Sequence, residues 1–161
     1  MRILHILDHG LPLQSGYTFR TRAILKAQEA RGWTVAAVTG QRHGSAAAAV
    51  ESVDGLTFHR TPATRRSGPL GEIAGIRAFA RRIEAAVDAF RPDILHAHSP
   101  VLDALAGLIV ARRRKLPLVY EIRASGRMPR SVTAPGPRDR SPIGRRARSR
   151  PGRSAVRTAS R

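Results

Sequence analysis

Short apolar runs alternate with longer amphipathic stretches over the first 123 residues. The first run, Ile3–Leu7, is continuously apolar, which is typical of a strand buried on both faces of a parallel sheet. Strands are predicted at residues 3–7, 33–38, 56–59, 93–97 and 116–122, and helices at 18–31, 70–90 and 101–112. Because strands alternate with helices of this length, the pattern predicts a parallel sheet between helices, a Rossmann-like α/β sandwich with right-handed crossovers.

Two of the predicted helices carry an apolar face that should pack on the sheet. In the helix at 18–31, which Gly32 ends, we expect the inward side chains to be Phe19, Ala23, Ile24, Ala27 and Ala30. In the helix at 70–90, near-helical spacing selects Ile73, Ile76, Ala80, Ile83, Val87 and Phe90. That helix should stop before Pro92, because a proline disfavours helical backbone at the preceding residue.

The composition changes after Arg123. Residues 124–161 contain 11 Arg, six Ser, five Pro and four Gly, but no Leu, Phe, Tyr or Trp, so they cannot build a core. With one Asp they carry +10 of the formal charge of +18, which leaves +8 for residues 1–123. We therefore predict a folded domain at 1–123 and a disordered basic tail at 124–161.

Several classes of protein are disfavoured by what the sequence lacks. Without cysteine there is no disulfide framework, Cys-ligated zinc site or thiol nucleophile, which fits a reducing cytoplasm. No apolar run approaches the roughly 20 residues that a membrane-spanning helix needs. The N-terminal pattern predicts a strand and not a signal peptide. We expect a cytoplasmic protein, with peripheral contact at the inner membrane as an option.

Ligands of an open parallel sheet bind at the carboxyl ends of its strands. Ser15 and Gly16 follow the first strand at a helix start, where free backbone N–H groups favour a phosphate. The alternative is that Ser15 only caps the helix. The Gly-x-Gly-x-x-Gly pattern and the P-loop spacing are both absent, which disfavours a nicotinamide enzyme and an ATPase.

The fourth predicted strand ends in a His-x-His pair. Strand alternation places His96 and His98 on one side, and His98, at the tip, is the candidate catalytic group because imidazole moves protons near neutral pH. We expect no metal, since no third ligand at a recognised spacing accompanies the pair. For His96, as for His5 and His59, the other interpretation is a buried, hydrogen-bonded histidine.

Charged residues end the last strand and cover two helices. Glu121 and Arg123 share a side, as an ion pair or as contacts for a polar substrate. The basic residues of the helices, which either rest on anionic lipid or are simply solvated, are Arg77, Arg81, Arg82 and the run 112–115. Few aromatic side chains are available for base stacking, so nucleic-acid binding by this domain lacks support.

Segments 2–8, 11–20, 91–100 and 119–124 together resemble the N-terminal domain of family 4 retaining glycosyltransferases. The similarity is closest to the bacterial group associated with exosortase and exopolysaccharide gene clusters. It implies one half of a GT-B enzyme, in which two Rossmann-like domains face each other across a cleft. Such an enzyme, of hexosyltransferase type, transfers a sugar from a nucleotide-sugar donor to a lipid-linked or polysaccharide acceptor, with retention and with no metal or other cofactor.

The same resemblance assigns roles to the candidate residues. It implies that Ser15 and Gly16 approach the donor diphosphate or the acceptor, and that His98 lines the reaction centre with the loop after Arg123. Glu121 joins them as a substrate-binding residue. One departure is that Gly16 stands alone where many relatives carry a glycine pair.

Residues 124–161 do not resemble the C-terminal domain that holds the nucleotide sugar in this family. Relatives continue with Phe-Trp-Glu-Asp-Ala where this chain has Ser125–Pro129. Deleting one T from the codons TTC TGG GAG GAT GCC yields codons for Ser-Gly-Arg-Met-Pro, so we hypothesise a one-base slip near Ala124. The fragment alone is then expected to be inactive, because transfer needs both reactants oriented in a closed cleft.

Two other functions remain open at this point. The Arg-rich tail can make the chain a basic module that binds nucleic acid through phosphates, with strongly salt-dependent affinity. Alternatively, the domain pairs with a separately encoded C-terminal half.

Overall fold

The structure, a computed structural model, describes residues 1–44, 48–63 and 68–123. The predicted tail at 124–161 lies outside the described residues. The frameshift hypothesis and the nucleic-acid alternative concern this tail, so the structure does not test them. The helices are α1 (Gly16–Glu29), α2 (Pro69–Phe90) and α3 (Val101–Arg114), with a short 3₁₀ turn η1 (Gln41–His43). The strands are β1 (Arg2–Leu7), β2 (Thr34–Thr39), β3 (Val50–Val53), β4 (Leu56–Arg60), β5 (Ile94–His98) and β6 (Leu118–Glu121).

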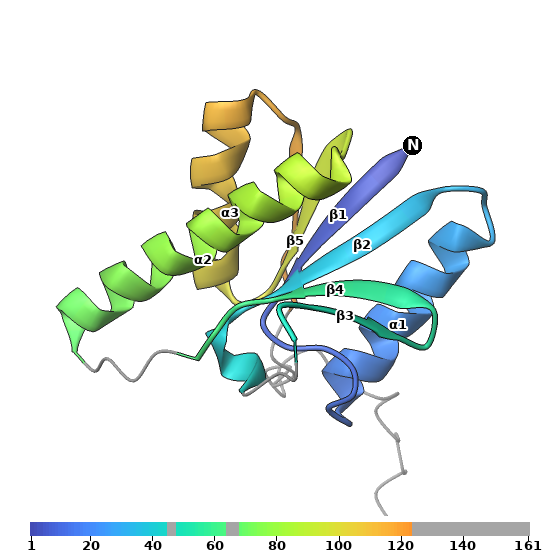
Figure 1. Ribbon diagram of the computed structural model, residues 1–161, viewed down its shortest axis with the longest axis horizontal. Coiled ribbons are helices and arrows are strands. Elements are labelled where there is room, and N and C mark those ends of the chain that lie inside the picture. The colour runs from blue at the N-terminus through green and yellow to red at the C-terminus, as the bar shows by residue number, and fades with distance from the viewer. Residues whose placement is uncertain (45–47, 64–67, 124–161) are drawn as a thin grey trace, which may run out of the picture. The chain divides into compact units, whose positions relative to one another are not determined.

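The six strands form one sheet in the order β3-β4-β2-β1-β5-β6 (Figure 1). Neighbours from β4 to β6 pair in parallel, which confirms the predicted Rossmann-like fold class. The edge strand β3 was not predicted, and it pairs antiparallel with β4 through a tight hairpin. Its turn, Asp54-Gly55, has positive φ at both residues (57° and 74°), the backbone that a two-residue hairpin requires.

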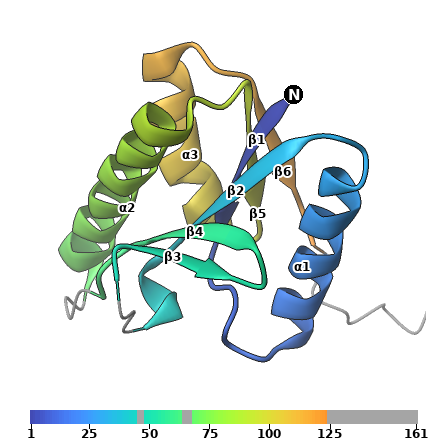
Figure 2. The same cartoon turned by 45° about the vertical axis from the view of Figure 1, so that its right-hand side comes forward.

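Helices cover both faces of the sheet, with α1 on one side and α2 and α3 on the other (Figure 2). Side chains of β1 alternate between two cores: Leu4 and Ile6 pack beneath α2 and α3, whereas Ile3 and Leu7 pack with Leu25 of α1. All five residues 3–7 are buried, as expected of a strand covered on both faces.

The predicted inward face of α1 is wrong. Its buried residues are Thr18, Thr21 and Leu25, whereas Phe19 is 54% exposed. The physical reason is that Thr18 and Thr21 satisfy their hydroxyls within the helix and its cap, while Gln28 contacts His5 of the sheet, so that polar residues stand on the inward face and apolar spacing selects a different one. Of the other residues expected to face inward, Ala23, Ala27 and Ala30 are exposed and Ile24 is half-buried.

The inward face of α2 is largely as predicted. The residues buried in its later turns include Phe79, Ala80, Ile83 and Val87. Ile73 is an exception, since it is half exposed. The first turns of α2 line a cavity beside the sheet instead of packing on it, which removes the need for an apolar side chain there.

Candidate functional site

The ends of β5 and β6 bring three predicted site residues together. Pairing between these strands places His98 opposite Glu121, and Glu121 Oε2 lies 3.2 Å from His98 Nδ1. Glu121 Oε1 lies 3.6 Å from Arg123 Nε, so the predicted ion pair is confirmed. Arg20 of α1, which the sequence analysis did not select, donates a hydrogen bond of 2.6 Å to the same oxygen. One carboxylate therefore holds two guanidinium groups and faces an imidazole.

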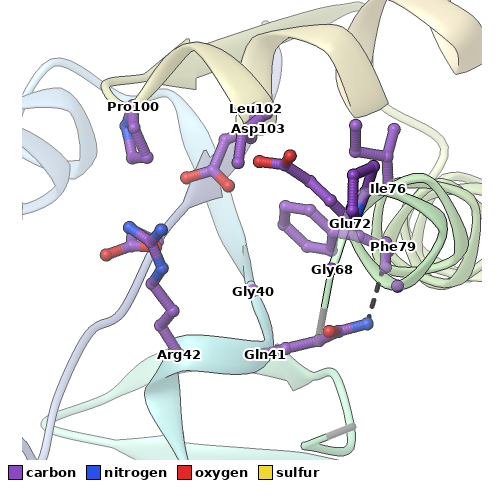
Figure 3. A pocket seen from close by; sticks show the side chains of 14 residues that line it. Gly40, Gln41, Arg42, Gly68, Glu72, Ile76, Phe79, Pro100, Leu102 and Asp103 are labelled. Carbon is purple, nitrogen blue, oxygen red and sulfur yellow. Dashed lines mark hydrogen bonds and ion pairs between the residues drawn. The ribbon is translucent and has the colours of Figure 1, made fainter. Parts of the chain in front are cut away.

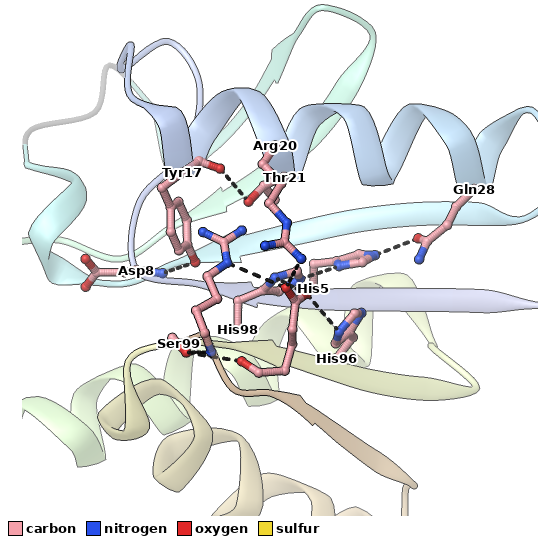
Figure 4. A network of polar contacts seen from close by, with 11 residues as sticks. His5, Asp8, Tyr17, Arg20, Thr21, Gln28, His96, His98 and Ser99 are labelled. Carbon is pink, nitrogen blue, oxygen red and sulfur yellow. Dashed lines mark hydrogen bonds and ion pairs between the residues drawn. The ribbon is translucent and has the colours of Figure 1, made fainter. Parts of the chain in front are cut away.

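His98 belongs to a buried chain of polar contacts beneath α1 (Figure 4). Its Nε2 lies 3.0 Å from Nδ1 of His5, whose Nε2 lies 2.8 Å from Oε1 of Gln28. His96 stacks on His98 with ring centroids 4.4 Å apart, which confirms that the two share a side of β5. The interpretation of His5 as a buried, hydrogen-bonded histidine is confirmed as well, but its partnership with His98 was not foreseen.

Burial keeps these imidazoles neutral. Desolvation, followed by the neighbouring His96, lowers the pKa of His5 to about 3. Desolvation, followed by His5 and His96, lowers the pKa of His98 to about 2. Both rings are fully buried, so His98 acts at neutral pH as an uncharged hydrogen-bonding group whose contact with the surface runs through Glu121.

The structure corrects the reason given for expecting no metal. A third imidazole is present, because His5, His96 and His98 offer nitrogens that all lie within 4.8 Å of one another. His5 comes from β1, so no sequence spacing could reveal it. Both nitrogens of His5 already face partners at hydrogen-bond distance, which opposes ligation by this residue. The expected absence of a metal stays a prediction.

The start of α1 lies beside this cluster. Ser15 caps the helix, since its Oγ accepts a hydrogen bond of 3.1 Å from the backbone N–H of Thr18. The capping interpretation is therefore confirmed, while a role for Ser15 in binding stays a prediction. Gly16 is exposed, and a methyl group on its Cα would meet no atom within 4 Å. Packing within the domain does not require glycine here, and the space beside it is open to a ligand.

Arg123 ties the start of α1 to the end of β6, and Ser99, which follows β5, holds the backbone there. The guanidinium of Arg123 lies over the ring of Tyr17, 4.3 Å from its centroid. Ser99 Oγ accepts a 2.8 Å hydrogen bond from the Arg123 backbone N–H and donates one of 3.1 Å to the Glu121 carbonyl. Nε and Nη2 of Arg123 are buried without a hydrogen-bond partner among the described residues. Because Nε already faces the Glu121 carboxylate at 3.6 Å, the donor of Arg123 that has neither a hydrogen bond nor this ion pair is Nη2.

A second feature of the same sheet edge is a cavity of about 540 Å³ on the side of α2 and α3 (Figure 3). It lies at the ends of β1 and β2, and acidic side chains from three different elements line it: Asp8, Glu72 and Asp103. The sequence analysis did not select it.

The basic residues of α2 and α3 are partly paired. Arg114 contacts Asp88 at 2.9 Å and Glu84 at 3.5 Å, and Arg113 contacts Glu84 at 3.7 Å. These contacts join the two helices, so much of the charge of the run 112–115 is balanced locally. Within the described ranges, no helix has the length and apolar character needed to cross a membrane.

Comparisons with known proteins place this fold among sugar-transferring and other enzymes. No curated protein matches the sequence. Sucrose-phosphate synthase from Thermosynechococcus elongatus superposes with a TM-score of 0.55 at 18% identity, over 74% of this chain and 31% of that one. The catalytic domain of starch synthase IV from Arabidopsis thaliana, bound to ADP and acarbose, gives 0.54 at 15% identity, over 73% and 33%. The chain thus spans about a third of the length of these two proteins.

Structural likeness alone does not decide the function. A C-terminal domain of the PF1911 hydrogenase from Pyrococcus furiosus also gives a TM-score of 0.54, at 15% identity over 75% of this chain and 90% of that domain. At these identities the likeness shows the fold alone. The sequence family is more specific: the model of the glycosyl transferase 4-like domain matches residues 15–161. This chain therefore belongs to the glycosyl transferase 4-like domain family.

Proposed function

We propose that this chain is the acceptor-side half of an enzyme that moves a sugar from a nucleotide-sugar donor to a lipid-linked or polysaccharide acceptor, in exopolysaccharide synthesis. The observation that carries the proposal is the convergence of His98, Glu121 and Arg123 beside the first turn of α1. Family membership supports the reaction class, and starch synthase IV, which shares the fold, was solved with ADP and a sugar analogue bound.

Arg123 and the first turn of α1 form the anion-binding part of the proposed site. Two Arg123 nitrogens have no hydrogen-bond partner among the described residues, and guanidinium–phosphate hydrogen bonds are charge-assisted. The first backbone N–H groups of a helix have no intrahelical acceptor and favour an anion. The open space at Gly16 lets a diphosphate reach them. Ser15 fixes the direction of this helix start through its cap.

Glu121 and His98 form the part that contacts the sugar. The Glu121 side chain is 21% exposed, so its carboxylate can accept a hydrogen bond from a substrate hydroxyl. His98 is buried beneath it, where the contact of its Nε2 with Nδ1 of His5 fixes the ring, and its Nδ1 lies 3.2 Å from Glu121 without a hydrogen bond. His98 therefore contributes to the reaction centre by shaping the surroundings of Glu121. A second domain closes the cleft over the donor, so residues 1–123 alone do not turn over.

Amide chemical-shift mapping with inorganic pyrophosphate at low ionic strength tests the anion-binding part of this proposal. We expect the largest shifts at Gly16, Tyr17 and Arg123, and their loss in Arg123→Gln. Arg31→Gln, at the exposed end of α1, is the matched control and keeps them. The proposal fails if pyrophosphate shifts other amides or shifts the same ones equally in Arg123→Gln.

We also propose that the start of α2 rests on an anionic membrane surface. Leu70 is 83% exposed, and Ile73, Arg77 and Arg81 follow at helical spacing on the same face. Exposed apolar side chains next to basic ones on one helix face bind the headgroup region of anionic bilayers. This surface replaces the run 112–115 as the stronger candidate, because two arginines of that run, Arg113 and Arg114, pair with acids.

A further inference from the structure

Asp103 is the buried titratable group that the proposed mechanism does not use. It lies in the first turn of α3, is only 5% exposed, and has no hydrogen-bond partner for Oδ2 among the described residues. Burial, followed by the charge of Asp8, raises its pKa to about 8. A buried carboxyl oxygen without a hydrogen-bond partner lowers stability, and such atoms are rare unless a ligand or water completes their hydrogen bonds.

The cavity into which Asp103 points has the size and composition of a small-ligand site. Asp103 and Glu72 point into it from two different helices, and Arg42 approaches from the 3₁₀ turn η1 (Figure 3). Its volume of about 540 Å³ lies within the range of small-molecule pockets. Ile76, Phe79 and Leu102 provide an apolar wall. Polar groups thus converge on one side of the cavity and apolar groups on another.

Two glycines in the lining leave little room for side chains. A Cβ at Gly40 would lie 3.3 Å from the carbonyl oxygen of Asp8 and 3.6 Å from Oδ1 of Asp103. A Cβ at Gly75 would lie 3.3 Å from Oε1 of Gln41. Larger residues at these positions would press on the lining, so both glycines help keep the cavity open.

The charge of the lining selects the class of ligand. Asp8 and Glu72 place two carboxylates in the lining against the single guanidinium of Arg42, and Asp103 is held neutral, so a phosphate or carboxylate would meet net repulsion. A neutral polyol meets none: carboxylates accept hydrogen bonds from hydroxyls, and the protonated Asp103 carboxyl and Arg42 donate them. The apolar wall suits the C–H face of a sugar ring.

We propose that this cavity binds one neutral pyranose ring of the acceptor through its hydroxyl groups. The inference rests on the proposed transferase function and deepens it, because it divides the sheet edge into two subsites of opposite character. Anions go to Arg123 on the α1 side, and the uncharged acceptor sugar goes to Asp103 on the side of α2 and α3. Asp8, at the end of β1, lies between them, lining the cavity and donating its backbone N–H to Tyr17 Oη at 3.2 Å.

Titration of the whole chain with methyl glycosides of common hexoses, followed by amide chemical shifts, tests the proposal. At least one glycoside should shift the amides of Gly40, Glu72 and Asp103 with a Kd in the millimolar range. Asp103→Asn keeps the shape but changes the hydrogen-bonding pattern, and should weaken binding about tenfold, the ratio expected when a hydrogen bond is lost. Asp88→Asn, on the exposed part of α2, is the matched control and should have no effect.

Glu72→Gln keeps the test falsifiable if Asp103→Asn does not fold, because Glu72 is exposed and its replacement leaves the core intact. It should also weaken glycoside binding. The proposal would be overturned if no glycoside shifted these amides, or if both variants bound glycosides as tightly as the wild type does. It would also be overturned if glucose 6-phosphate bound at this cavity more tightly than the neutral glycosides. Glycoside binding here without pyrophosphate binding at Arg123 would instead support the cavity and refute the proposed anion site.

Discussion

Two sets of buried groups make the stability of the fold depend on pH in opposite directions, and replacing Asp103 separates their contributions. His5 and His98, with pKa values lowered from 6.5 to about 3 and about 2, stay neutral in the native protein and take up protons only when it unfolds. Stability is therefore lost as the pH falls below 6.5. Asp103, raised from 3.8 to about 8, is protonated in the native protein and ionised in the unfolded chain between these values. Its contribution is lost as the pH rises through that window.

The expected slopes follow from counting protons. Each proton of difference changes the unfolding free energy by about 1.4 kcal/mol per pH unit. Between pH 4 and 6.5 the two histidines bind two more protons in the unfolded chain and Asp103 binds one fewer, so wild-type stability rises by about 1.4 kcal/mol per unit. Above pH 6.5 only Asp103 acts, and stability falls. The wild type therefore has a stability maximum near pH 6.5.

Asp103→Asn removes the opposing contribution. The slope of the variant below pH 6.5 should exceed that of the wild type by one proton, and its profile should then level off instead of falling. His43, His59 and His96, whose pKa values burial also lowers, steepen the rise in both proteins, so the wild-type slope given above is a lower bound and the difference between the two profiles depends on Asp103 alone.

Urea denaturation between pH 5 and 8, followed by fluorescence of Trp33, the single tryptophan, measures both profiles. Trp33 is half-buried against the core beneath α1, so its emission reports global unfolding. Parallel profiles of wild type and variant would refute the protonated state assigned to Asp103. A wild-type curve that is flat between pH 5 and 6.5 would refute the assignment of neutral, buried histidines.

Three other predictions address packing, membrane contact and the reading frame. Gly107→Ala should lower the unfolding free energy by about 1–3 kcal/mol, because the new Cβ would lie 2.7 Å from Ile6 Cδ1. The same urea assay measures the change, and unchanged stability would contradict the close packing of α3 on β1. Leu70→Ser with Ile73→Ser should reduce co-sedimentation with vesicles containing anionic lipid, while Val119→Ser, at a position of β6 as exposed as Ile73, should not; equal losses would refute the proposed membrane contact. Resequencing the DNA across codon 124 should reveal an alternative frame that encodes a second Rossmann-like domain, and its absence would refute the frameshift hypothesis.

The parts of the site that lie at strand ends were predictable from the sequence. His98, Glu121 and Arg123 meet because the carboxyl ends of parallel strands share one edge and alternate residues share one side. Ser15 and Gly16 were found for the same reason, as the first helix start after β1.

Other parts depend on contacts that no local pattern reveals. His5 and His98 are 93 residues apart, and only the pairing of β1 with β5 shows that they touch. From the sequence alone, Asp103 would be interpreted as an acid in the first turn of a helix that complements the helix dipole. Only the packing of α3 shows that its carboxyl group is buried beside a cavity. The polar inward face of α1 was missed because its threonines bond within the helix and its cap and Gln28 contacts His5, so apolar spacing is a poor guide there.

Calorimetric titration with UDP tests the central claim, an anion-binding transferase site at the α1 edge of the sheet, most directly. Wild type and Arg31→Gln should bind UDP with equal affinity, Arg123→Gln should bind it about tenfold more weakly, and added salt should weaken all three. Gly16→Val, whose Cβ would meet no atom within 4 Å, should also weaken binding by filling the approach to the helix start. Equal affinity in all four proteins, or no binding in any, would contradict the account.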